Sequence, residues 1–114
     1  MSEFVDVCSV TDLVRDAGVA ALVNGRQVAL FWIGGQIYAV DNYDPLGQAN
    51  VMSRGMTGDR QGELTVASPL HKEHYSLLSG KCLDVEGVFL PVYAARVAGD
   101  RVEVSLKQRV EIVQ

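Results

Sequence analysis

Two histidines in one short segment are the residues of this chain best suited to chemistry. His71 and His74 form a His-x-x-His pair with Glu73 between them, and imidazole and carboxylate groups are common ligands of transition metals. Asp44 could complete such a site from a second loop. In the simpler alternative, His71 is a structural residue that hydrogen-bonds to Asp44 or to a backbone carbonyl. We predict the structural role, because the spacing lacks the His-Glu-x-x-His pattern of zinc peptidases.

Catalysis by this chain alone finds little support in its sequence. Asp44 and His71 could act as a general acid and base, but a proline follows Ser68, which does not lie in a nucleophile elbow. The glycine-rich signatures that cradle dinucleotides or nucleoside triphosphates are also missing. Cys8 and Cys82 are too few for a four-thiolate metal site or a disulfide framework, so we expect both to be reduced thiols.

The elements that must position these groups are short strands. The chain has 114 residues, of which 48% are hydrophobic and 21% are charged, as is typical of one globular domain spanning 1–114. Turn signals such as Asn24-Gly25 and Gly34-Gly35 recur at short intervals, which favours an all-β fold. Stretches rich in β-branched and aromatic residues predict strands at Phe4 to Val7, Gln27 to Ile33, Gln36 to Asp41, Glu63 to Ala67, Tyr75 to Leu78, Val88 to Val97 and Arg101 to Leu106.

Three segments depart from this strand pattern. Thr11 to Gly18 begins with a possible N-cap hydroxyl and ends with a glycine, so we predict one short helix there. About twenty residues from Asn42 to Gly62 show no clear periodicity, and such long loops in compact domains are usually functional. Residues 107–114 either fray or add an edge strand, and their valine and isoleucine content favours order.

Charge and hydropathy exclude several classes of partner. Ten basic and fourteen acidic residues give a formal net charge of -4, so no summed positive field is available for phosphates. We therefore expect neither nucleic acid nor a membrane surface as a partner. The longest dense apolar run, Val28 to Ile33, is far shorter than the ~20 residues of a membrane-spanning helix, and the N-terminus lacks a leader pattern. These features favour a cytoplasmic protein.

Two loops resemble the ligand loops of a Rieske-type iron–sulfur domain. Ala67 to Leu83 is similar to the second loop, in which Cys-Pro-x-His is followed by an aromatic residue, here Tyr75, and then by a Ser/Thr-Gly turn, here Ser79-Gly80. Tyr38 to Ala49 is similar to the first loop, where Cys-Pro-His precedes a Gly-Ala-like turn. The resemblance runs from about Val5 to Leu106. It implies a Rieske-like antiparallel β-sandwich or barrel whose two ligand loops meet at one tip.

The ligand positions themselves depart from the Rieske pattern. A Rieske cluster needs two thiolates on one iron and two imidazoles on the other. In the four corresponding positions this chain has Asp44, Leu46, Ser68 and His71. Leucine cannot coordinate iron, and a neutral serine hydroxyl is a poor substitute for a thiolate. We therefore predict that these positions are degenerate and that the chain holds no [2Fe-2S] cluster and no other cofactor.

Three motifs resemble the small subunit of the assimilatory NAD(P)H-dependent nitrite reductase, a Rieske-like family with this loss of ligands. They are Asn42–Pro45, Ala49–Gly55 and Ser68–Tyr75, which match in order and spacing. The resemblance implies an accessory subunit of an oxidoreductase that reduces nitrite to ammonia, not catalytic alone, beside a large subunit holding FAD, an iron–sulfur cluster and sirohaem. Two alternatives stay open: a Rieske-type electron-transfer ferredoxin with altered metal ligation, and a free-standing binding module without a link to nitrite.

A mixed apolar and cationic surface is expected where the two loops meet. Aromatic, methionine and arginine residues are enriched in protein interfaces. The predicted interface with the large subunit comprises Tyr43, Leu46, Met52, Arg54, Met56, Arg60, Leu70 and Lys72. Phe31, Trp32 and Phe89 lie within strand-like runs and are predicted to be core residues.

Overall fold

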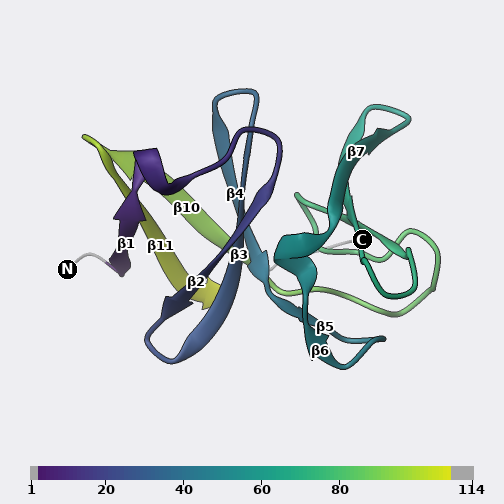
Figure 1. The fold of residues 1–114 in the computed structure, drawn as a ribbon. Helices are drawn as coiled ribbons and strands as arrows, with labels where there is room; N and C mark the ends of the chain where they lie inside the picture. Colours follow the sequence, from purple (N-terminus) through teal and green to yellow (C-terminus); the bar gives the residue numbers. More distant parts are fainter. Residues whose placement is uncertain (1–2, 109–114) are drawn as a thin grey trace.

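The larger of two regions is a six-stranded antiparallel sheet, which we call the base. The computed structural model describes residues 3–108, and the base strands are hydrogen-bonded in the order β1-β11-β10-β4-β3-β2 (Figure 1). These strands are β1 Phe4–Ser9, β2 Gly18–Val23, β3 Arg26–Ile33, β4 Gln36–Asp41, β10 Val92–Ala98 and β11 Arg101–Gln108. The predicted all-β fold class is confirmed.

The second region consists of residues 42–91, between β4 and β10, and we call it the tip. It contains a two-stranded sheet, β5-β6, and a three-stranded sheet, β7-β8-β9, which lie to the right of the base in Figure 1. The tip strands are β5 Tyr43–Asp44, β6 Ala49–Asn50, β7 Met56–Arg60, β8 Glu63–Ala67 and β9 His74–Ser76. All ligand positions inferred from the resemblance therefore lie in the tip.

Local sequence signals account well for the base. Asn24 and Gly25 have φ angles of 48° and 86°, which is the positive-φ pair that a type I′ hairpin turn requires between β2 and β3. In β11 the alternating residues Val102 and Val104 are fully buried while Glu103 is only partly covered, as expected for a strand with one face on the core. The predicted base strands are confirmed within a few residues, except that β10 begins at Val92 and not at Val88.

Two apolar clusters cover the two faces of β3. Leu30 packs in a cluster inside the base with residues of β10 and β11, whereas the adjacent Phe31 packs in a second cluster with Met52 and Tyr75 of the tip. Because neighbouring residues of a strand point to opposite faces, a strand covered on both sides is buried at consecutive positions. The second cluster is what attaches the tip to the base.

The three aromatic residues predicted to lie in the core differ in how deeply they are buried. Phe31 is fully buried and Trp32 is half-buried against the base cluster. The prediction for Phe89 is wrong, because its side chain is 56% exposed. Phe89 precedes β10 in an extended segment that bridges to Lys81, and there the next residue, Leu90, takes the inward position with 1% exposure.

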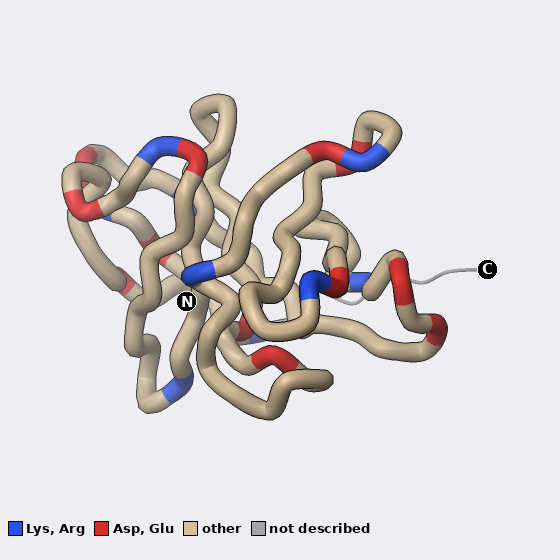
Figure 2. The backbone as a smooth tube through the Cα atoms, turned by 45° about the vertical axis from the view of Figure 1, so that its right-hand side comes forward, with Lys and Arg blue, Asp and Glu red and all other residues tan. Residues whose placement is uncertain are grey.

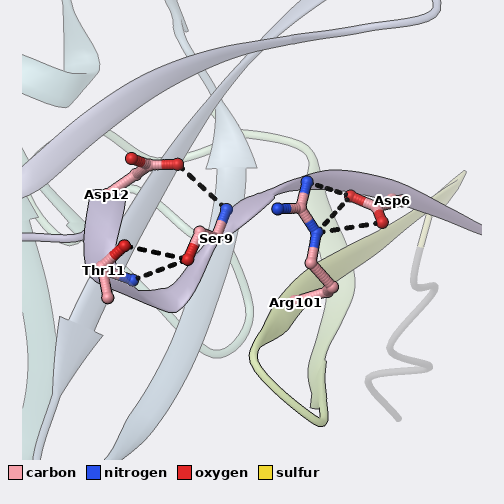
Figure 3. Close-up of polar contacts among 5 residues, drawn as sticks. All are labelled: Asp6, Ser9, Thr11, Asp12 and Arg101. Atoms are coloured by element: carbon pink, nitrogen blue, oxygen red, sulfur yellow. Dashed lines mark hydrogen bonds and ion pairs between the residues drawn. The ribbon is translucent and has the colours of Figure 1, made fainter.

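The predicted helix from Thr11 to Gly18 is wrong. Only the 3-10 turn η1, Val10–Asp12, forms there, and it is capped by the preceding Ser9. Figure 3 shows the capping box: the Ser9 hydroxyl oxygen accepts from the Thr11 N–H at 3.2 Å, and the Ser9 N–H donates to the Asp12 carboxylate at 2.9 Å. The chain then extends, and Gly18 opens β2 in close contact with the carbonyl of Ser53, where a side chain would not fit.

The predicted loop from Asn42 to Gly62 is more ordered than its sequence indicates. It contains β5, β6, the 3-10 turn η2 at Met52–Arg54, and β7. At the other end of the chain, β11 includes Lys107 and Gln108, and the remaining predicted edge-strand residues 109–114 lie outside the described part. The assignment of 1–114 to a single domain stays a prediction.

Acidic and basic residues are dispersed over the described surface. Figure 2 shows both signs on the base and on the tip, without a continuous basic face. Within residues 3–108, no helix has the length and apolar character needed to span a bilayer.

Candidate functional site

Two turns of the tip share one backbone geometry. The first is Asp44–Gln48 and the second is Ser68–Lys72, and each has a proline and then a leucine after its polar first residue. The N–H of Gln48 donates to the Asp44 carbonyl at 2.7 Å, and the N–H of Lys72 donates to the Ser68 carbonyl at 3.0 Å. Gln48 and Lys72 also share a left-handed conformation, with φ angles of 57° and 66°. We call these segments the first and second Pro-Leu turns.

In each Pro-Leu turn, the side chain of the polar first residue accepts a hydrogen bond from the backbone N–H of the leucine. Asp44 Oδ1 accepts from the Leu46 N–H at 3.0 Å, and Ser68 Oγ accepts from the Leu70 N–H at 3.2 Å. The two turns are also joined, because the Ser68 hydroxyl donates to Asp44 Oδ2 in a short hydrogen bond. Both polar side chains are fully buried. The structure therefore brings together two of the predicted positions, Asp44 and Ser68, which are 24 residues apart in the sequence.

The hydrogen bond between Ser68 and Asp44 is stronger when the Asp44 carboxylate is ionised. Burial raises the pKa of Asp44, but hydrogen bonds from Ser68, from two backbone N–H groups and from Tyr75 outweigh burial and lower the pKa below its usual value. The Tyr75 hydroxyl donates to Asp44 Oδ1 at 3.4 Å. Burial, and then the charge of Asp44, raises the pKa of Tyr75, which stays a neutral donor. The buried charge is thus compensated by donors on both loops.

The remaining predicted interface residues are mostly at the surface. Tyr43, Met56 and Leu70 are 42%, 75% and 47% exposed, and Arg54 and Lys72 are also exposed. Leu46 and Arg60 are half-buried.

Met52 cannot be part of an exposed surface, so that prediction is wrong. It is fully buried and packs in the cluster that joins the tip to the base. The 3-10 turn η2 directs this side chain inward.

Asn42 is a structural residue whose role the sequence did not reveal. It is 1% exposed, its side-chain amide donates to Gln27 Oε1 at 3.0 Å, and its side-chain oxygen accepts from the Ser53 N–H at 2.7 Å. Asn42 therefore ties η2 of the tip to β3 of the base. The asparagine two residues before Asp44 was part of a recognised motif, but only the structure identifies its partners.

Comparison with known proteins agrees with this arrangement. Residues 3–105 match the model of the Rieske-like [2Fe-2S] domain family. The nitrite reductase (NADH) small subunit of Escherichia coli is 40% identical over 99 residues, which cover 85% of this chain and 92% of that protein. The chain belongs to the family of nitrite reductase small subunits.

Two further relatives extend this result. The crystal structure of a putative NADH-dependent nitrite reductase small subunit from Mycobacterium tuberculosis has a TM-score of 0.84 and 42% identity, with 96% of each chain covered. A protein of Klebsiella oxytoca named nitrite reductase [NAD(P)H] large subunit is 37% identical over 102 residues, which cover 90% of this chain but 11% of that protein. A region similar to this small-subunit chain is thus part of a much longer polypeptide there.

The side chains at the four ligand positions do not fit the cluster after which the Rieske family is named. The Asp44 carboxylate and the Ser68 hydroxyl bond to each other, Leu46 has no donor atom in its side chain, and His71 is exposed. Two thiolates and two imidazoles are needed. Among residues 3–108, no three His, Cys, Asp or Glu side chains are grouped so that they could hold a metal ion.

The two cysteines lie outside both Pro-Leu turns. Both are free thiols, as predicted. Cys82 is 2% exposed in the cluster between tip and base, and Cys8 lies in β1, where burial raises its pKa and favours the protonated form.

His74 lies in a cluster with the ion pair between Arg60 and Asp84. The Asp84 carboxylate accepts from the His74 backbone N–H at 2.7 Å and pairs with Arg60 at 3.0 Å, and Arg60 also contacts His74 Nδ1 at 3.0 Å. The hydrogen bonds from the His74 backbone and from Arg60 lower the pKa of Asp84 to about 2. Nothing in the sequence singled out Asp84. Of the two partners expected for His71, Asp44 or a backbone carbonyl, Asp44 is bonded to Ser68.

Proposed function

We propose that this chain is the small accessory subunit of an NAD(P)H-dependent nitrite reductase, which reduces nitrite to ammonia in the cytoplasm. It binds the large catalytic subunit through its tip and carries no [2Fe-2S] cluster. FAD, an iron–sulfur cluster and sirohaem belong to the large subunit. The chain is thus part of an oxidoreductase but not catalytic alone.

One observation carries the proposal that no cluster is bound. At the place where the resemblance puts two ligand loops, Asp44 and Ser68 hydrogen-bond to each other out of contact with solvent. A fully satisfied polar pair of this kind is strong in a medium of low dielectric constant. A cluster would have to disrupt this pair and would also need two thiolates, which neither Pro-Leu turn contains. Protein groups alone therefore account for the shape of the tip.

The Klebsiella oxytoca relative supports the choice of partner. A region similar to this chain is covalently joined there to the remainder of a protein named as a large subunit. Covalent joining holds two domains at a high effective concentration. A domain that is separate in one protein and fused in another is expected to make the same contact by binding.

The exposed side chains of the tip suit such a contact. Leu70 and Tyr43 present apolar and aromatic surface, and Arg54 and Lys72 are exposed cations of the same region, residues 42–91. This is the mixture of residue types that protein interfaces favour.

Purification from the source cell with a tagged small subunit tests the proposal. We expect the chain to co-purify with a sirohaem-containing large subunit, and the separated chain to be colourless with far less than stoichiometric iron. Failure of the two purified subunits to associate at micromolar concentration would contradict the proposed partner and favour a free-standing module. Two irons per chain, with the visible absorption of a Rieske cluster, would contradict the absence of the cluster.

The ferredoxin alternative differs in its prediction for His71. If the chain transferred electrons through altered ligation, His71→Ala would abolish its reversible redox signal. Under the proposed function the isolated chain gives no such signal before or after the substitution. Protein-film voltammetry of the wild-type chain and of His71→Ala decides between a ferredoxin and an accessory subunit.

A further inference from the structure

We propose that Asp44 and Ser68 are positioning residues that present Leu46 and Leu70 as a pair of apolar anchors to a recess with an acidic rim on the large subunit. This inference rests on the proposed function and adds to it the residues that give the docking surface its shape.

The first argument is that each leucine is held by the residue two positions before it. The Leu46 N–H is bonded to Asp44 and the Leu70 N–H to Ser68. The hydrogen bond between the Asp44 and Ser68 side chains then fixes the two turns relative to each other. The backbone positions of both leucines are therefore set by one buried polar link.

The second argument is that the two turns are nested. A Cβ atom added to Gly47 would lie 2.5 Å from Leu70 Cδ1 and 2.7 Å from Asp44 Oδ2. The Leu70 side chain of the second turn therefore rests on the backbone of the first turn. Even so, 47% of Leu70 remains exposed, although the side chain is apolar and its backbone is rigidly held.

The third argument concerns the chemistry of the partner. A rigid apolar group loses little conformational entropy on binding, so pre-organised leucines favour association with an apolar recess. Lys72 closes the second turn two residues after Leu70, and Arg54 is exposed on η2 elsewhere in the tip. Acidic groups around the recess would complement these cations and steer the encounter.

A third turn of the tip provides a matched control. In Ser76–Gly80, the buried Ser76 Oγ accepts from the Leu78 N–H at 3.1 Å, and the Gly80 N–H donates to the Ser76 carbonyl at 2.9 Å. Leu78 is 48% exposed, almost the same as Leu70. The chemistry of this turn matches that of the second Pro-Leu turn, but its serine has no hydrogen bond to Asp44.

The decisive comparison is between Ser68→Ala and Ser76→Ala. Each variant is titrated calorimetrically with the purified large subunit, and its melting temperature is measured. We expect Ser68→Ala to weaken binding about fivefold to tenfold, the range equivalent to one net hydrogen bond. Ser76→Ala should stay within about twofold of wild type in binding, although it too loses thermal stability because Ser76 Oγ accepts from the N–H groups of Leu78 and Ser79. Equal weakening by both variants, or no weakening by Ser68→Ala, would overturn the positioning role.

A second pair of variants keeps the test decisive if either serine variant folds poorly. Gly47→Ala adds a methyl group that meets both Leu70 Cδ1 and the buried Asp44 carboxylate, so it should displace the two turns relative to each other, weaken binding and lower the melting temperature. Gly58→Ala in β7 is its control, because a Cβ atom there would meet only Thr65 Oγ1 at 3.8 Å. Unchanged binding by folded Gly47→Ala contradicts the inference.

Leu70→Asp separates this inference from the proposed function. It places a negative charge on the exposed anchor and should weaken binding by at least about tenfold, as expected for the loss of a central interface residue. If Leu70→Asp binds as tightly as wild type, the tip is not the docking surface and the proposed function loses its binding site. If Leu70→Asp binds weakly while Ser68→Ala binds normally, only the positioning role is wrong.

Discussion

The base and the tip of this small subunit are stabilised by different interactions. The interior of the base consists of apolar side chains such as Leu30, Val102 and Val104, and Ser105 is its single buried polar side chain among the described residues. In the tip, five polar or charged side chains are buried within 35 residues: Asn42, Asp44, Thr65, Ser68 and Ser76. Apolar burial is non-directional, whereas hydrogen bonds fix the relative orientation of the groups they join.

This difference indicates that the base and the tip contribute differently to stability and to binding. We expect the base to contribute much of the stability and to tolerate small shifts of its side chains, while the tip depends on defined partners to give its turns their shape. Substitutions in the base should therefore change stability without changing the binding surface. Substitutions of buried polar groups in the tip should change the binding surface more than the stability.

The largest effect is expected in the base. Leu30→Ala removes a fully buried side chain from the base cluster and should lower the free energy of unfolding by about 2–5 kcal/mol. Urea denaturation followed by circular dichroism measures the loss. Leu22→Ala on the neighbouring strand β2 is the control, since Leu22 is 71% exposed and should change little. Similar losses for both variants would contradict the assignment of the base as the source of stability.

The second-largest effect on stability is expected where the backbone of Gly80 packs closely against that of Leu90 in the tip. Gly80 has a φ of 79°, and a Cβ atom added there would collide with the carbonyl oxygen of Leu90. Gly80→Ala should therefore cost about 1–3 kcal/mol of unfolding free energy. Gly25→Ala has the same conformational penalty, with a φ of 86°, but nothing lies within 4 Å of its Cβ position. The excess loss of Gly80→Ala over Gly25→Ala measures the close approach, and no excess would argue against it.

Lowering the pH should remove stabilising interactions in the tip, whereas protonation of Asp41 in the base should favour the fold. The pKa values of Asp44 and Asp84 in the tip are lowered by hydrogen bonds that outweigh burial, whereas burial raises the pKa of Asp41 at the end of β4. A carboxyl with a lowered pKa stabilises the fold above its unfolded pKa of ~4 and loses this contribution as the pH falls toward the folded value. A carboxyl with a raised pKa favours the fold more as it becomes protonated.

Hydrogen exchange between pH 6 and pH 3 measures this contrast after correction for the intrinsic rates. Protection of the Leu46 and His74 amides should fall on acidification before protection of the β3 amides does. In Asp84→Asn, the acid-dependent part of the loss at His74 should be much smaller, because the group that titrates is gone. Parallel loss of protection throughout the molecule would indicate that the tip and base respond to acid as one unit.

The smallest effect is expected from an exposed ion pair of the base. Figure 3 shows that Arg101 binds both oxygens of Asp6, joining β11 to β1, with an N–O distance of 2.7 Å. The two side chains are 45% and 52% exposed, and solvent and salt screen such pairs. Arg101→Gln should leave the melting temperature nearly unchanged at 0.15 M salt, as measured by calorimetry. A large decrease would show that the base too depends on defined polar partners.

Much of the base could be predicted from local sequence because its signals are local. The alternation in β11 and the Asn24-Gly25 turn specify strand faces and a hairpin without reference to distant residues. The predicted helix after β1 was wrong because Gly18 is needed for contact with Ser53, which is 35 positions away. The glycine that looked like a helix end is explained by packing.

The tip could be predicted only in outline. The family resemblance singled out Asp44 and Ser68, but the hydrogen bond between them is visible only in the structure, as is the fact that Ser68, and not His71, binds Asp44. Asp84 was missed because its role depends on Arg60 and His74, which no sequence spacing connects with it. Local sequence patterns do not reveal which side chains distant in the sequence will contact one another.

The link between the two Pro-Leu turns also has a consequence for how the subunit matures. Its donors and acceptors are all encoded in the polypeptide, so the tip can reach its final shape as soon as both turns have emerged from the ribosome. If the tip carries no cluster, as proposed above, the chain should need no metallochaperone or scaffold protein, and its yield should follow translation and not the iron supply of the cell.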